Sequence, residues 1–223
     1  MSALIAAAFV SAAAQCFASP LPAPAASPAL PSTRPALVFV THAAFFSQET
    51  RRSPAIDPQA FVRDDAAAEG TGPQNIAHVA GLRTARIDDL PESVAYTAKR
   101  DSLGFTVQKW FGANGMVELA SGTGGATRAT FSFKKLIAFG VYSLFRINFS
   151  PDGATFLPFD GDGTTNTFTA SVDGTAAMVM TSPDALPRGS AIVLIYHSDA
   201  QEHGTSRGEI GVSAHHQLIV RLQ

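Results

Sequence analysis

Histidines concentrate near the C-terminal end of this sequence, with acidic residues beside them. Four of the six histidines lie between residues 197 and 216. Imidazole and carboxylate groups are ligands for zinc and copper, at bond lengths of about 2.0–2.2 Å. We therefore predict a Zn or Cu site among His197, Asp199, His203, His215 and His216.

The strands expected around these residues determine whether the side chains can meet. His197 follows the apolar segment 191–196, whereas His215 and His216 precede the segment 217–222. If the two segments are neighbouring strands, the end of the first and the start of the second lie at one rim of a sheet. Adjacent residues of a strand point to opposite faces, so only one of His215 and His216 can join the site. In the alternative interpretation the histidines hydrogen-bond to loop backbone and hold a long connection in place.

The second half of the sequence has the two-residue periodicity of β-strands. Alternating or apolar segments are separated by turn clusters such as Asn114-Gly115 and Asp173-Gly174, at intervals of about ten residues. The clearest predicted strands are 126–133, 142–149, 167–171, 176–181, 191–197 and 217–222. This pattern predicts an all-β fold, an antiparallel two-sheet β-sandwich over residues 101–223. Prolines at 158 and 183 favour open edges over a closed barrel. The pattern leaves open whether the topology is jelly-roll or immunoglobulin-like.

The first hundred residues are predicted to form a signal peptide, a linker and a poorly ordered segment. Residues 3–14 are uncharged and apolar, and Ala18 completes a small-residue cleavage site, so we predict a signal peptide over 1–18. The apolar run is shorter than the ~20 residues of a membrane span, and we expect none. Residues 19–56 are predicted to be a Pro/Ala-rich linker that is largely disordered. Residues 57–100 are predicted to be poorly ordered, with short helices starting near Asp57 and Asp89.

The leader places the protein outside the cytoplasm, periplasmic or secreted, and its alanine-rich composition is typical of bacteria. Cleavage after Ala18 removes Cys16, which is the single cysteine, and so excludes disulfides and thiolate sites from the mature chain. The net charge of −2 gives no basic surface for nucleic acid.

Three further patterns have both a functional and a structural interpretation. Residues 204–208 match the G-x-S-x-G pattern of a serine hydrolase, but glycines and a predicted strand follow in place of a helix. The Asp-Gly pairs at 160–163 offer oxygens to calcium, although such pairs are turn formers first. Trp110 could stack on a sugar ring, and the interpretation we favour is a core anchor.

Three functions remain open from the sequence. The first is a non-enzymatic binding or interaction module for an unknown small ligand or protein, with the histidine-rich loops as its functional surface. The second is a metal-dependent enzyme that uses the same histidines, with Glu202 or Glu209 as general base. The third is a structural surface protein. The sequence leaves the oligomeric state open.

Overall fold

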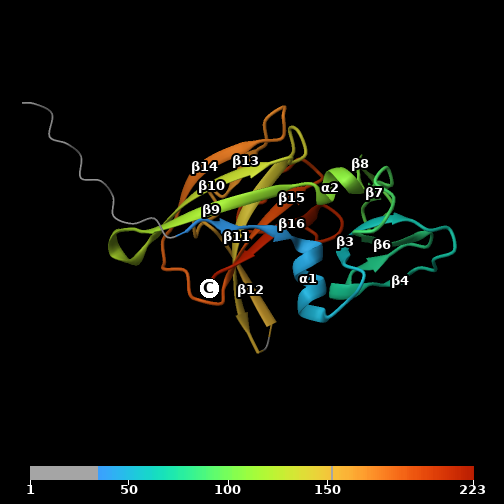
Figure 1. The fold of residues 1–223 in the computed structure, drawn as a ribbon, viewed down its shortest axis with the longest axis horizontal. Helices are drawn as coiled ribbons and strands as arrows, with labels where there is room; N and C mark the ends of the chain where they lie inside the picture. The colour runs from blue at the N-terminus through green and yellow to red at the C-terminus, as the bar shows by residue number, and fades with distance from the viewer. Residues whose placement is uncertain (1–34, 152) are drawn as a thin grey trace, which may run out of the picture. The chain divides into compact units, whose positions relative to one another are not determined.

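Two antiparallel sheets with a shared apolar core form the main body of the computed structural model, which describes residues 35–151 and 153–223 (Figure 1). The first sheet has the order β1-β9-β10-β14, and the second has the order β12-β11-β15-β16-β2, with β13 also paired to β11. The strands of the first sheet are Leu37–Val38, Asn114–Ser121, Thr127–Lys134 and Ala176–Ser182, in the order given. Those of the second are Gly153–Pro158, Val141–Ser150, Ala191–His197, Ala214–Arg221 and Val40–Thr41, with β13 at Thr167–Thr169. The predicted all-β class with antiparallel sheets is confirmed.

The core between the two sheets is built by alternate residues of each strand. Phe131 and Phe133 of β10 are buried, as the alternation predicts, and they face Tyr142 and Leu144 of β11 within one cluster. The ring of Phe131 meets Phe159 edge-on at 5.2 Å between centroids. Burial of large aromatic side chains such as these supplies most of the apolar driving force for folding.

The central strands β15 and β16 of the second sheet are buried on both faces, which explains why β15 is a continuous apolar run. Val193 and Ile195 belong to a separate cluster on the far side of the sheet, against which Phe45 of α1 packs. Helix α1 spans His42–Thr50 and begins at the N-cap Thr41, whose hydroxyl accepts a hydrogen bond from Ala44 N at 3.2 Å. A strand covered on both sides needs apolar residues at every position.

A third, four-stranded sheet occupies the region that the sequence analysis treated as poorly ordered (Figure 1). Its order is β6-β3-β7-β8, with strands Leu82–Arg86, Ile56–Arg63, Val94–Tyr96 and Ser102–Thr106. Between β3 and β6 in the sequence, strands β4 (Gly70–Thr71) and β5 (Ala77–His78) form a separate two-stranded ribbon. A short 3-10 turn at Pro73–Asn75 connects them. The prediction of a poorly ordered segment over 57–100 with short helices at Asp57 and Asp89 is therefore wrong.

Asp57 and Pro58 lie in strand β3 rather than at the start of a helix. The register of β3 against β6 shifts between Asp57 and Phe61, so the ladder is irregular where proline lacks its N–H group. An irregularity of this kind is one of the few places where a strand accepts proline. The local properties of Asp57-Pro58 suit either the start of a helix or an irregular strand. The pairing of β3 with β6 selects the strand.

The prediction of a linker over 19–56 is also wrong for residues 37–50. Residues 37–50 form β1, β2 and α1 and belong to the sandwich. The predicted signal peptide and residues 19–34 lie outside the described residues. In the part of the chain that the structure describes, no helix has the length and apolar character needed to cross a membrane.

Neither predicted hairpin is present. Asp173-Gly174 does form a turn before β14, with a φ of 74° at Gly174, but the flanking strands β13 and β14 lie in different sheets. Asn114 and Gly115 instead lie within β9, which follows the short helix α2, Val107–Phe111. A Cβ at Gly115 would lie 2.3 Å from the ring of Phe133, so the glycine makes room for a core phenylalanine.

Candidate metal centre

Three of the five predicted ligands meet where β15 ends. His197 is the last residue of β15, and the loop 198–213 that leads to β16 supplies Asp199 and His203. One potential ligand atom from each of the three residues lies within 4.8 Å of the other two. The cluster combines two imidazoles with one carboxylate, a donor set that suits zinc or copper.

The ligand atoms lie close to one another but not at the separations of a tetrahedral site. His203 Nε2 and Asp199 Oδ2 lie 3.0 Å apart, and the rings of His197 and His203 are 4.8 Å apart at their centroids. Ligands bound tetrahedrally at about 2.1 Å are separated by roughly 3.4 Å. The side chains of His203 and Asp199 are partly exposed, at 22% and 33%, and can close this difference by rotation.

His197 is the buried member of the cluster, and its environment keeps the ring neutral. Its Nε2 lies 2.7 Å from the Ser143 hydroxyl oxygen, whereas its Nδ1 is buried with no hydrogen-bond partner in the structure. Burial, with a smaller contribution from His203, lowers the pKa of His197 to about 4, although Asp199 opposes the shift. Neutral imidazole is the form that binds metals, and Nδ1 is the nitrogen left available when Nε2 bonds to Ser143.

The loop that carries Asp199 and His203 is held at several points. Ser198 donates its hydroxyl to Val212 O at 2.8 Å, and the buried Asn166 amide donates to Gly204 O at 3.3 Å. Gly208 has a φ of 79°, and a Cβ there would lie 3.3 Å from His203 Nε2. The loop is therefore anchored at both ends and keeps a small residue beside the ligand nitrogen.

His215 and His216 lie outside this cluster. As predicted for adjacent strand residues, they point to opposite faces of β16. The ring of His215 lies 6.3 Å from those of Trp110 and Tyr196, and the ring of His216 lies 5.0 Å from that of His42. Burial lowers the pKa of both imidazoles. The predicted five-residue site is thus reduced to three residues.

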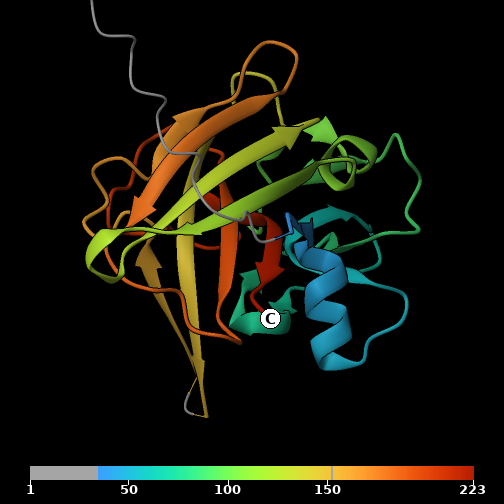
Figure 2. The ribbon, with the colours of Figure 1, turned by 60° about the vertical axis from the view of Figure 1, so that its left-hand side comes forward.

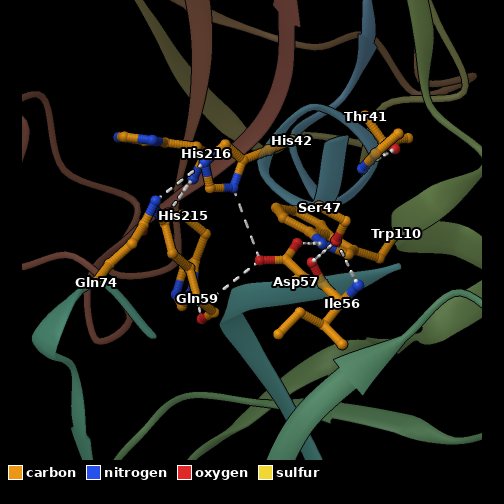
Figure 3. A network of polar contacts seen from close by, with 11 residues as sticks. Thr41, His42, Ser47, Ile56, Asp57, Gln59, Gln74, Trp110, His215 and His216 are labelled. Atoms are coloured by element: carbon orange, nitrogen blue, oxygen red, sulfur yellow. Dashed lines mark hydrogen bonds and ion pairs between the residues drawn. The ribbon is translucent and has the colours of Figure 1, made fainter. Parts of the chain in front are cut away.

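Both residues instead belong to a buried polar network that the sequence did not indicate, His215 through its ring and His216 through its backbone N–H (Figure 3). Asp57 accepts hydrogen bonds from Trp110 Nε1 at 2.7 Å and from Gln59 N at 2.9 Å. The side-chain oxygen of Gln59 accepts from His216 N at 2.6 Å, and its backbone oxygen lies 2.9 Å from His215 Nδ1. The network connects β3 of the third sheet to β16 of the sandwich. Trp110 is a core anchor with 1% exposure, not a surface platform.

Sequence signals for the missed residues are weak. Asp57 and Gln59 stand two positions apart just before the apolar run 60–62, a spacing that places two polar groups on one face of a strand. Ser143 is one polar residue among the alternating positions of β11. Its contact with His197 can be expected only once β11 and β15 are known to pair.

The other two patterns have structural roles. Ser206 lies in the loop and its hydroxyl accepts from Gly208 N at 3.2 Å, without the strand-to-helix turn that a nucleophile elbow requires. The carboxylate of Asp160 accepts from Gly163 N at 2.9 Å and from Thr165 N at 2.6 Å, which makes it the organiser of a turn. Glu209, one of the two candidate bases, pairs with Lys99 at 3.1 Å.

Comparison with protein-family models, with curated proteins and with solved structures gave no match for this chain. The chemistry of the three-residue cluster is therefore the basis for assigning a function.

Proposed function

We propose that this chain is an extracytoplasmic binding module that holds a zinc or copper ion at His197, Asp199 and His203. The observation that carries the proposal is the convergence of three potential ligand atoms within 4.8 Å, with a buried imidazole as one of them. The leader-like first 18 residues support the extracytoplasmic location.

The surroundings of His197, rather than its unpaired nitrogen alone, favour a ligand role over a loop-support role. An unpaired buried polar atom destabilises the fold, yet His42, His215 and His216 each also have one unpaired ring nitrogen. His197 Nε2 bonds to Ser143 and Nδ1 has no partner among the described residues, while one ring nitrogen of His197 lies within 4.8 Å of ligand atoms of both His203 and Asp199. A cation bound at Nδ1 would satisfy that nitrogen.

The direct test is metal binding by the full chain after treatment with EDTA. We expect calorimetric titration with zinc sulfate or copper sulfate to give one equivalent per chain. At a free metal concentration 100 times the dissociation constant, binding adds about 2.7 kcal/mol of stability. For a chain of this size, that corresponds to a rise in Tm of about 5–11 °C.

Variants separate the proposed site from adventitious binding. His203→Ala and Asp199→Ala each remove one partly exposed ligand, and we expect each to weaken binding at least about tenfold. His78→Ala serves as the matched control, since His78 lies in β5 and bonds only to Val79 O at 3.2 Å. Stoichiometric binding that survives both ligand variants, or no binding by the wild-type chain, would refute the proposal.

A metal-dependent enzyme is the second candidate, because three protein ligands leave a coordination position for water, as in catalytic zinc sites. Its general base would be Glu202, since Glu209 is paired with Lys99. Hydrolysis of simple nitrophenyl esters and phosphates by the zinc-loaded chain, lost in Glu202→Gln with metal content unchanged, would favour the enzyme over the binding module. If the chain binds no metal and the alanine variants lose only thermal stability, the histidines act as structural supports.

A further inference from the structure

We propose that two copies of this chain associate through strand β14, which pairs antiparallel with the same strand of the second copy. In the described part of the chain, β14 pairs only with β10 and ends the first sheet (Figure 2). None of the residues 176–181 makes a backbone hydrogen bond outside that pairing. Every second residue of such a strand directs its N–H and C=O groups away from the sheet, where another strand can bond to them.

The other edges of the described sheets carry features that discourage pairing. Strands β1 and β2 have two residues each, and β12 ends at Pro158. In the third sheet, β6 contains Arg83 and Arg86, and β8 contains Gly104 with a φ of 77°. Short length, proline, charge and irregular backbone are the usual means by which proteins protect their edges. Strand β14, Ala-Ala-Met-Val-Met-Thr-Ser, has none of them within its seven residues, and Pro183 comes only after its last residue.

The sequence of β14 is complementary to itself, which selects a second copy as the partner. Antiparallel pairing about a two-fold axis at Val179 places Met178 opposite Met180 of the second copy, and Ala177 opposite Thr181. No pair in this register brings like charges together, and each joins side chains of compatible character. The axis satisfies the closed symmetry of a dimer, so pairing ends at two copies.

Burial within the monomer is consistent with this register. Met178 and Met180 point toward the shared core, and Met178 stays only partly buried at the edge. Val179 points to the outer face and is 48% exposed. Joining two copies would extend the core across the edge and cover the exposed flank of the valine.

The test is sedimentation of the full chain from about 1 to 500 µM, a range chosen because edge pairing buries a small interface of the transient class. We expect a concentration-dependent monomer–dimer equilibrium. Val179→Lys places two like charges opposite each other at the axis, and we expect it to be monomeric over the same range. Thr130→Lys is the matched control. Thr130 lies directly opposite Val179 on β10, on the same outer face but away from the edge, and the variant should dimerise as the wild type does.

A charge-reversal experiment identifies the strand that pairs. Because residue 179 meets its own copy, Val179→Lys mixed with Val179→Glu should form a mixed dimer, although each variant alone is monomeric. Circular dichroism and Tm confirm that both variants fold. A wild-type chain that is monomeric at 500 µM, a dimer that survives Val179→Lys, or a mixture that fails to associate would each overturn the proposal. Loss of the dimer in Thr130→Lys would assign the contact to the sheet face and overturn it as well.

Discussion

Replacement of Asp57 by alanine tests whether the buried network holds the third sheet to the sandwich. Asp57 is 1% exposed, and its carboxylate accepts from two donors, Trp110 Nε1 and Gln59 N (Figure 3). Both donors are buried, so neither gains a water molecule when the carboxylate is removed. An unsatisfied buried donor destabilises the fold by about 1–3 kcal/mol, and two give roughly 2–6 kcal/mol.

Chemical and thermal unfolding followed by circular dichroism measure this change. For a chain of this size, a loss of about 4 kcal/mol lowers Tm by roughly 8–16 °C. Asp57→Asn keeps one acceptor oxygen, and we expect a smaller loss. Glu49→Ala is the control, because its carboxylate pairs with Arg221 on the surface at 3.2 Å. Exposed pairs contribute at most about 1 kcal/mol. An Asp57→Ala protein within about 1 kcal/mol of the wild type would show that the network does not stabilise the junction.

Three further predictions concern the site and the turns. Because the pKa of His197 is lowered to about 4 in the folded state, its contribution to metal-free stability is complete above pH 6.5 and is lost as pH falls from 6.5 toward 4. Unfolding at several pH values in EDTA should show a loss of up to about 3 kcal/mol that His197→Gln lacks. Ser143→Ala removes the group that bonds to His197 Nε2, and calorimetry should show metal affinity lowered about 10–100-fold with the fold intact. Gly174→Ala should destabilise the protein more than Gly104→Ala: both have positive φ, but a Cβ at Gly174 would lie 2.3 Å from Leu136 O and one at Gly104 meets nothing within 4 Å. Equal Tm values for the two glycine variants would contradict the backbone clash.

The sequence alone determined most strands of the second half, although not β9 or β12, and the members of the candidate cluster that are close in sequence. The segment 191–197 was predicted with the bounds that the structure shows, because its apolar run and flanking turn residues are local properties. His197, Asp199 and His203 lie within seven positions, so the end of one strand and the start of one loop bring them together.

Only the tertiary structure decided which strands pair, and this decided the rest of the site. Ser143 reaches His197 because β11 pairs with β15, across 54 positions of sequence. The register of β15 against β16 shifts after Leu194, which sets where His215 and His216 lie. Asp57-Pro58 became a strand because β6 and the sandwich offered partners for its polar groups. Two-residue periodicity specifies that a segment is extended and which face is apolar, but its partner is chosen by long-range burial and hydrogen bonding that no local pattern contains.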